Sequence, residues 1–394
     1  MKTKLIATTL ILMTTGAVAF YPFLSSSARN PQPVQPPVAT AQKIEAVFVL
    51  DTTGSMGGLI ETAKQKIWSI ATTLAQAEQA PEIRMGLVAY RDRGDAYVTE
   101  VVDLSTDLDT MYGRLMQFAA DGGGDTPESV NQALADAVNR ISWSQDPSSY
   151  QVIFLVGDAP PHLDYQAEAQ YPEIVRTATA KGIIVNTIQC GDLAQTVAPW
   201  TEIARLGNGR YLKVGQAGDA FAVTTPYDDE IAQLSAELDG TRLFYGDTEQ
   251  MAVLGAKVAA TDHLREAASA AARARRAVFN ATESGLKNLF GDQDLVEDVS
   301  KGEVSLDAVP EEELPETLRE LDRAGQEQVI EELAGRRSEL QSRIDALAQV
   351  RADYIDERIA EQGGADDSLD RQIYDVVKDQ AAPAGLSFES GPEY

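Results

Sequence analysis

Short hydrophobic runs alternate with helix-length amphipathic segments between residues 43 and 214. The runs at 44–50, 83–90 and 150–156 have the length and apolar content of buried strands. Residues 57–78 instead place hydrophobic side chains three or four positions apart, which is the spacing of a helix. Because strands separated by helices form parallel sheets covered on both faces, this region predicts a layered α/β fold.

One pair of strands interrupts this alternation. Only a short turn at 91–96 separates the second strand from a third at 97–104, so we expect an antiparallel hairpin at the sheet edge. Two more strands are expected at 183–189 and 210–214, and further helices at 107–119, 127–142, 165–181 and 195–206. The predicted fold class is α/β, a doubly wound, mostly parallel, Rossmann-like sheet with one antiparallel edge strand.

Residues 226–362 show helical patterns and no strand pattern. We expect one helix at 228–242, an alanine-rich helix at 247–283 and a long helix at 316–362. In the last of these, Leu residues recur every seven positions, as in a coiled coil. The connector between the two long helices contains Gly and Pro, which favours a self-contained helical hairpin. A bundle packed on the sheet domain and a coiled-coil homodimer are the alternatives.

The two ends of the chain have different patterns again. A basic start and an apolar stretch precede a small-residue cleavage site at 17–19, so residues 1–19 are expected to be a secretory signal peptide. Residues 20–42 are rich in Pro and Gln, which is typical of an extended tether. We therefore expect a periplasmic or secreted protein that contacts the membrane only if the signal stays uncleaved. Residues 363–394 are expected to form one helix near 368–380 and a loose C-terminal tail.

Charge and composition limit the partners and the kinds of metal site that the protein can have. The 394 residues include 33 Lys and Arg against 61 Asp and Glu, which gives a formal net charge of −28. A surface of this charge repels nucleic-acid phosphates and attracts cations or basic partners. With one cysteine and two histidines, the sequence excludes an intramolecular disulfide and a multi-cysteine zinc site.

Acids and hydroxyls follow the ends of the predicted strands. Asp51, Thr53 and Ser55 follow the first strand, and Asp158 follows the fourth. The glycine-rich loop at 121–128 adds Asp125 and Thr126. The carboxyl ends of neighbouring parallel strands meet at one sheet edge, where such oxygens suit Mg²⁺, Mn²⁺ or Ca²⁺. Singly, each has an alternative role, since Ser55 and Thr126 could cap helices and the aspartates could be solvated acids.

Together, Asp51, Thr53, Ser55, Thr126 and Asp158 resemble the metal-ion-dependent adhesion site (MIDAS) of a von Willebrand factor type A (VWA) domain. The resemblance covers residues 43 to about 220, within a predicted domain at 43–225, and the chain is identified as an exported bacterial member with a helical C-terminal region. It implies that the three hydroxyls approach Mg²⁺, or Mn²⁺ or Ca²⁺, and that the two aspartates act directly or through water. An Asp or Glu of a protein partner would complete the coordination. Asp125 is the alternative ligand from the same loop.

Finer features resemble a subgroup of these domains. The stretches 88–92, 122–128 and 158–162 are similar to VWA domains attached to alpha-kinases. Within them, we expect Arg91, Asp92 and Asp95 to form a solvated turn. His162 is expected to be a loop histidine with a local hydrogen bond, and a partner-contacting or metal-adjacent role is the alternative.

The expected function is a metal-dependent protein-binding module, for adhesion or scaffolding, in the cell envelope, and not an enzyme. One alternative is a structural stalk in which the helices do the work and the metal site is not essential. Another is a hydrolase that uses Ser55. Strand, turn, serine and helix do resemble a nucleophile elbow, but that motif needs glycine where Thr53 stands.

Overall fold

A six-stranded sheet forms the centre of the α/β part of the chain. In the computed structural model the strand order is β3-β2-β1-β4-β5-β6, with β2 and β3 antiparallel and every other neighbouring pair parallel. The strands are β1 (Lys43–Asp51), β2 (Glu82–Tyr90), β3 (Thr99–Ser105), β4 (Tyr150–Gly157), β5 (Ile184–Cys190) and β6 (Asn208–Val214). The predicted fold class, a doubly wound sheet with one antiparallel edge strand, is confirmed.

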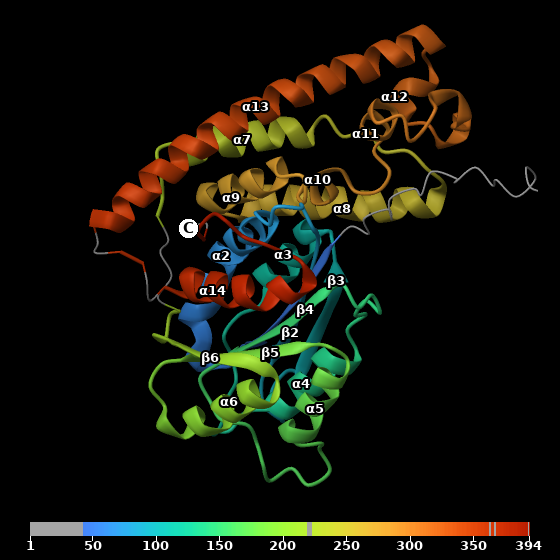
Figure 1. Cartoon of the computed structure of the whole chain (residues 1–394). Helices are drawn as coiled ribbons and strands as arrows, with labels where there is room; N and C mark the ends of the chain where they lie inside the picture. The colour runs from blue at the N-terminus through green and yellow to red at the C-terminus, as the bar shows by residue number, and fades with distance from the viewer. Residues whose placement is uncertain (1–41, 219–222, 362–363, 366–367, 393) are drawn as a thin grey trace, which may run out of the picture. The chain divides into compact units, whose positions relative to one another are not determined.

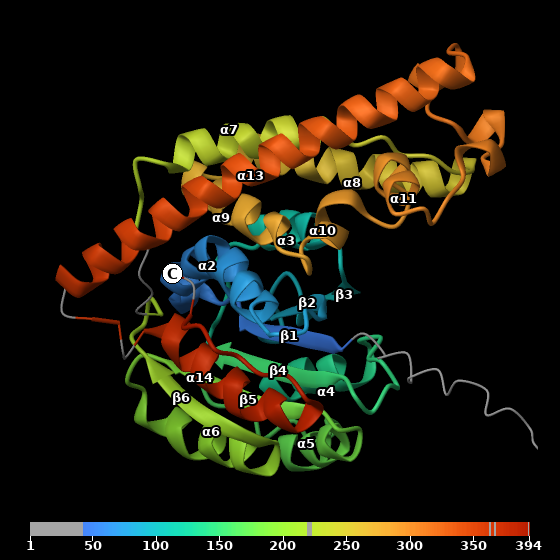
Figure 2. The same ribbon diagram turned by 45° about the horizontal axis from the view of Figure 1, so that its top comes forward.

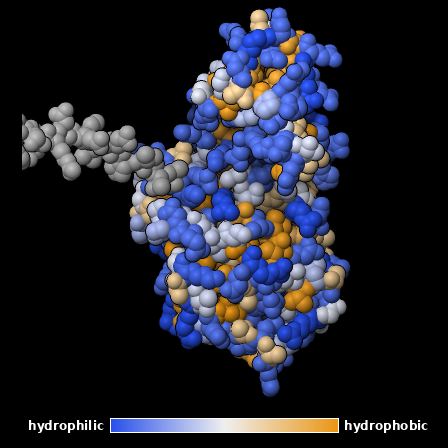
Figure 3. Space-filling model, turned by 90° about the vertical axis from the view of Figure 1, so that its right-hand side faces the viewer, coloured by the Kyte–Doolittle hydropathy of each residue, from blue (hydrophilic) through white to orange (hydrophobic). Residues whose placement is uncertain are grey.

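The structure describes residues 42–218, 223–361, 364–365, 368–392 and 394. The predicted signal peptide and nearly all of the predicted tether lie outside the described residues. No helix in the described part of the chain is long and apolar enough to cross a membrane. Hydrophilic side chains cover most of the face shown in Figure 3, and the apolar patches on it are separate from one another.

Helices cover both faces of the sheet because β1 is apolar on both (Figure 1). Ile44, Phe48 and Leu50 belong to the core on one face, whereas Val47 and Val49 belong to the core on the other. The first face carries α2 (Gly57–Ala75), α3 (Leu108–Gln117) and α14 (Leu369–Ala381). The second carries α4 (Val130–Asn139), α5 (Tyr171–Ala180) and α6 (Ala194–Leu206).

The region after the sheet is helical, as predicted, but it is more finely divided (Figure 2). Its helices are α7 (Asp228–Asp239), α8 (Thr248–Ala267), α9 (Ala270–Ala281), α10 (Leu286–Phe290), α11 (Leu295–Ser300), α12 (Glu316–Arg319) and α13 (Arg323–Glu361). Short 3₁₀ turns lie at Leu306–Ala308, Glu311–Glu313 and Ala382–Ala384. The expected single helix at 247–283 is two helices, because Ala268 is extended and the Ser269 side chain accepts a hydrogen bond from the Ala272 N–H.

The heptad residues of α13 do not form an isolated hairpin with the alanine-rich helices. Leu340 and Ile344 are fully buried in a core shared with α7, α9 and α10. Helix α9 in turn packs on α2 of the sheet domain, where the rings of Phe279 and Trp68 lie 6.0 Å apart. The structure therefore has the first of the two alternative arrangements, a helical bundle packed against the sheet domain.

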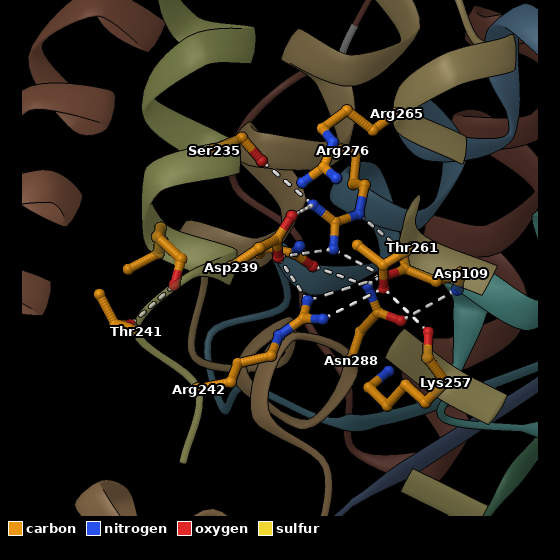
Figure 4. A network of polar contacts seen from close by, with 12 residues as sticks. Asp109, Ser235, Asp239, Thr241, Arg242, Lys257, Thr261, Arg265, Arg276 and Asn288 are labelled. Atoms are coloured by element: carbon orange, nitrogen blue, oxygen red, sulfur yellow. Dashed lines mark hydrogen bonds and ion pairs between the residues drawn. The ribbon is translucent and has the colours of Figure 1, made fainter. Parts of the chain in front are cut away.

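A buried network of charges joins the two parts (Figure 4). Asp109 of α3 has no exposed surface, and both of its oxygens accept hydrogen bonds from the Arg276 guanidinium of α9 at 2.6 Å. Thr261 of α8 donates to the same carboxylate at 2.8 Å, and Arg276 also pairs with Asp239 of α7 at 2.9 Å. Burial alone would raise the pKa of Asp109, but Arg276 holds that pKa well below its usual range.

The predicted helix near 368–380 is present as α14 (Leu369–Ala381), but the expectation of a loose tail after it is wrong for residues 382–388. Helix α14 packs on α2, and Leu386 and Phe388 belong to the core on the same face of the sheet. Lys66 of α2 and Asp370 of α14, both buried, lie 3.1 Å apart. This segment returns to the sheet because its apolar side chains complete that core.

Candidate functional site

The sheet brings Asp51 and Asp158 to the same edge. Asp51 is the last residue of β1 and Asp158 follows β4, and these strands are parallel neighbours with Leu50 opposite Val156. Gly157 permits their close approach, because a Cβ there would lie 3.0 Å from the Cβ of Asp51 and would clash with the Tyr90 hydroxyl. Asp51 is fully buried and Asp158 half-buried.

The loop after β1 arranges its three predicted ligands from the interior outward. The Oδ1 of Asp51 accepts hydrogen bonds from the backbone N–H of Thr53 at 2.9 Å and from its hydroxyl at 2.7 Å. The Thr53 Oγ1 lies 3.4 Å from the Oγ of Ser55, which is exposed. Because the Thr53 hydroxyl donates its proton to Asp51, its remaining lone pair is available to a cation.

Asp158 is held by a residue that the sequence analysis did not consider. Gln216, in the loop after β6, donates from Nε2 to the Oδ2 of Asp158 at 2.7 Å and to the backbone oxygen of Ser55 at 3.3 Å. On the other side, the Thr196 hydroxyl donates to the backbone oxygen of Asp158 at 2.8 Å. A single glutamine in a loop has no sequence signature that would have identified it.

The glycine-rich loop at 121–128 presents Glu128 to this edge. A Cβ on Gly123 would lie 3.3 Å from the Thr53 Cβ and 3.5 Å from the Oε1 of Glu128, so the three residues are close together. Gly122 and Gly123 both have positive φ, which lets the loop approach Thr53 closely. Glu128 is buried, whereas Asp125 and Thr126 are exposed.

The two residues predicted from this loop lie elsewhere. Among the described contacts, Thr126 forms no hydrogen bond with Asp51, Thr53, Ser55 or Asp158. The carboxylate of Asp125 lies near Asp92 and His162 instead. Sequence reasoning included Glu128 in its motif but gave it no role, because the loop contains several acids and only the fold shows which one is buried.

Burial and mutual repulsion determine the electrostatics of the site. Burial raises the pKa of Asp51 to about 7. The hydrogen bonds from Thr53 oppose this shift, and the negative charge of Asp158 adds to it. Burial raises the pKa of Glu128 to about 9, and repulsion from neighbouring acids, Asp51 first among them, adds to this shift. The pKa of the buried Tyr90 hydroxyl is also raised. These groups therefore form a cluster of acids, and among the described residues no Lys, Arg or His forms an ion pair with Asp51 or Glu128.

Three buried oxygens at this edge have no hydrogen-bond partner among the described residues. They are Oδ2 of Asp51, Oε2 of Glu128 and the hydroxyl of Tyr90. Buried polar atoms are almost always paired, and a bound ion is one explanation for an exception. A set of carboxylate and hydroxyl oxygens without nitrogen or sulfur fits a hard cation such as Mg²⁺, Mn²⁺ or Ca²⁺.

The neighbouring turn after β2 is not the solvated tip that was expected. Arg91 and Asp92 are each only 6% exposed. Arg91 donates to the backbone oxygens of Thr52 and Ala119, at 3.2 and 2.8 Å, and so holds the loops around the site. His162 has the expected local hydrogen bond, with its Nδ1 2.8 Å from the Oδ1 of Asp164.

Two curated proteins are similar to part of this chain. An ariadne-like RING finger protein of Acanthamoeba polyphaga mimivirus is 24% identical over 152 residues, which make up 38% of this chain and 14% of that protein. The alpha-protein kinase vwkA of Dictyostelium discoideum is 27% identical over 138 residues, 34% of this chain and 22% of the kinase. This chain therefore spans less than a quarter of the length of either relative.

Solved structures are also similar. The SpRpn10 VWA domain aligns with a TM-score of 0.34 and 13% identity, covering 49% of this chain and 95% of that one. Proximal thread matrix protein 1 from the mussel byssus aligns with a TM-score of 0.34 and 14% identity, covering 45% and 42%. Residues 45–223 match the family model of the von Willebrand factor A domain. This part of the chain, with its parallel sheet and the acidic edge at Asp51 and Asp158, is a von Willebrand factor A domain.

Proposed function

We propose that this VWA domain binds a protein partner through a divalent cation held at the carboxyl edge of the sheet. The observation that carries the proposal is the pair of buried, unpartnered carboxylate oxygens, Oδ2 of Asp51 and Oε2 of Glu128. Two acids buried this close together, without a basic side chain, are costly unless a cation neutralises them.

The residues that would hold the ion differ in burial and therefore in the role that each would have. Asp51 and Glu128 supply charge from the interior, and Thr53 supplies a hydroxyl whose proton already bonds to Asp51. Ser55 and Asp158 lie nearer the surface, where Gln216 fixes the Asp158 carboxylate. When bound, Mg²⁺, or Mn²⁺ or Ca²⁺, supplies an electrophilic position to which an Asp or Glu of the partner can bind.

Two observations support binding rather than hydrolysis by Ser55. Among the described residues, the side-chain group within hydrogen-bonding distance of the Ser55 Oγ is the Thr53 hydroxyl, which is not a general base. Both ring nitrogens of His162 lie near carboxylates, Asp92 and Asp164. The proposed site of action is the cell envelope, on the basis of the signal-peptide pattern at residues 1–19.

Thermal melting with and without metal tests the site directly. We expect Mg²⁺ to raise the melting temperature of the wild-type protein, because a ligand of the folded state stabilises it by linkage. Asp51→Ala and Asp158→Ala should abolish the rise. Asp262→Ala, which removes a half-exposed acid of α8, is the matched control and should keep it. An unchanged Mg²⁺ response in both site variants would reject the proposal.

Partner binding is tested by a pull-down from an envelope extract. A partner should be captured in Mg²⁺ and released by EDTA, and Asp51→Ala should capture none. Capture that is equal in EDTA and Mg²⁺ would show that binding uses another surface, such as the helices.

A further inference from the structure

A second cluster of ligand groups lies beside the VWA metal site. Asp92, Asp125 and His162 each offer one ligand atom, and these atoms all lie within 4.8 Å of one another. They come from three separate segments, the turn after β2, the loop before α4 and the loop after β4. We propose that these three side chains bind a second divalent ion, of the Zn²⁺ class.

The histidine is oriented as a metal-bound histidine is. Its Nδ1 lies 2.8 Å from the Oδ1 of Asp164, and because a carboxylate accepts, Nδ1 must carry the proton. In the neutral ring Nε2 then carries the lone pair, with the Tyr165 hydroxyl 3.1 Å away and the Oδ1 of Asp92 3.3 Å away. A carboxylate that accepts from the far nitrogen is the usual outer partner of a metal-bound imidazole, since it fixes the tautomer.

Asp92 is also held in place by outer partners. The hydroxyl of Ser129 donates to its Oδ1 at 2.9 Å, and the hydroxyl of Tyr165 donates to its two oxygens at 3.2 and 3.3 Å. The Tyr165 ring stacks on the imidazole with a centroid separation of 4.1 Å. Asp92 and His162 are buried, and the exposed Asp125 leaves a route for an ion from solvent.

The charge around the cluster favours a cation. Asp92, Asp125 and Asp164 contribute three carboxylates, and the backbone N–H of Asp92 is bonded to a fourth, Asp95, at 3.1 Å. The nearby Arg93 lies over the Tyr165 ring and pairs with Glu168 at 2.9 Å. A protonated His162 that bridges Asp92 and Asp164 without a metal is the competing explanation.

The donor set also distinguishes this ion from the one at the sheet edge. A ring nitrogen with two carboxylates suits Zn²⁺ and neighbouring transition metals, whereas the site at Asp51 offers oxygen alone and suits Mg²⁺. The two sites share the loop at 121–128, which carries both Asp125 and Glu128. An ion at the second site would therefore fix the loop that borders Asp51.

Metal analysis of the full chain tests the second site. Protein stripped with a chelator is titrated with Zn²⁺ while excess Mg²⁺ occupies the oxygen site, and bound zinc is counted after gel filtration. Co²⁺, titrated in the same way, reports nitrogen ligation through its visible absorption spectrum. We expect one tightly bound Zn²⁺ per chain. Asp164→Asn, which removes only the outer partner, should weaken it roughly 10–100-fold.

Substitution of a direct ligand should weaken Zn²⁺ binding more than Asp164→Asn does, and other residues of the chain serve as controls. Asp125→Asn and His162→Asn should each remove the tight Zn²⁺, and Asp125 is exposed, so its variant should fold normally. His263→Asn, at the exposed histidine of α8, and Asp51→Asn should retain it. The proposal is overturned if no tight Zn²⁺ binds, which would indicate the protonated bridge. It is also overturned if Asp125→Asn and His162→Asn bind Zn²⁺ as the wild type does, or if only Asp51→Asn loses it.

Discussion

Two buried aspartates in this protein face opposite environments. Asp51 at the sheet edge and Asp109 at the junction with the helices are both without exposed surface. Asp109 is paired with Arg276 and also accepts from Thr261, and its pKa lies well below the usual range. The Oδ2 of Asp51 accepts no hydrogen bond from the described residues, and burial raises the pKa of Asp51 to about 7.

The difference separates an acid that holds the fold together from an acid that is prepared for a ligand. At the junction, the chain supplies its own cation from α9, and the carboxylate is satisfied within the protein. At the sheet edge, no basic side chain approaches Asp51 among the described contacts, so the charge must be neutralised by a proton or by an ion from solution. Perturbed acids of the second kind are the ones that mark functional sites.

The largest effect should follow from removing the helices altogether. A fragment of residues 42–225 loses Arg276 and leaves Asp109 buried without its cation. It also uncovers the core around Trp68 and Tyr112 that Phe279 and Leu369 complete. We expect it to aggregate or to melt without cooperativity, measured by gel filtration and circular dichroism, because large apolar patches become exposed.

The control for this experiment is residues 42–394, which keep every described contact and should melt cooperatively. A soluble, monomeric and cooperative 42–225 fragment would contradict the expectation. It would show that the sheet domain is stable alone and that the junction is an addition to it.

Breaking the junction at one residue should be the next largest effect. Arg276→Ala leaves the buried Asp109 and the half-buried Asp239 without the guanidinium that they share, which should lower the free energy of unfolding by about 3–5 kcal/mol. Urea unfolding measures the loss. Arg265→Ala, whose pair with Asp262 is about half exposed, should change the free energy of unfolding by less than about 1 kcal/mol. If the two substitutions lowered the free energy of unfolding equally, the buried pair at the junction would contribute no more to stability than a surface pair.

The sheet and its acidic edge could be predicted from sequence, because both depend on local patterns. The buried strands are continuous apolar runs, and Asp51 and Asp158 stand directly after two of them. Parallel pairing then brings these two residues to one edge regardless of how the rest of the chain folds.

What could not be predicted depends on contacts between distant segments. The seven-residue repeat of Leu340 and its neighbours shows that a face of α13 is buried, but not that α7 and α9 bury it. Asp92 was expected in solvent because it lies in a polar turn, but it is buried and accepts hydrogen bonds from Ser129 and Tyr165. Glu128 could not be told from the other acids of its loop until the fold placed it beside Thr53.

The pH dependence of stability should distinguish the sheet edge from the junction. Asp51 and Glu128, with pKa values of about 7 and about 9 against unfolded values of 3.8 and 4.5, bind protons more tightly when folded. Above about pH 5 the unfolded chain has already lost these protons, whereas the folded chain loses them only near pH 7 at Asp51 and near pH 9 at Glu128. In EDTA the free energy of unfolding should therefore fall, on the order of 1 kcal/mol per pH unit.

Mg²⁺ should oppose this loss, because it replaces the protons on the same carboxylates. The stability difference between Mg²⁺ and EDTA should widen as pH rises over that range, and Asp51→Asn should narrow it. A constant difference from pH 5 to 9 would mean that the metal does not bind at the titrating acids. Asp109, whose pKa is lowered, contributes no loss in this window.

The smallest expected effect decides which residue of the glycine-rich loop belongs to the site. The family resemblance assigns Thr126, whereas in the structure Thr126 is exposed and the buried Glu128 lies beside Thr53. Glu128→Gln keeps the shape of the side chain and removes its charge, so Mg²⁺ binding should weaken about tenfold, or about 1.4 kcal/mol. Thr126→Val should change it by less, measured for both variants by calorimetric titration at pH 7.5. If Thr126→Val were the more damaging substitution, the loop would have to rearrange on binding metal, and Glu128 would resemble Asp109, a buried acid of the fold and not of the site.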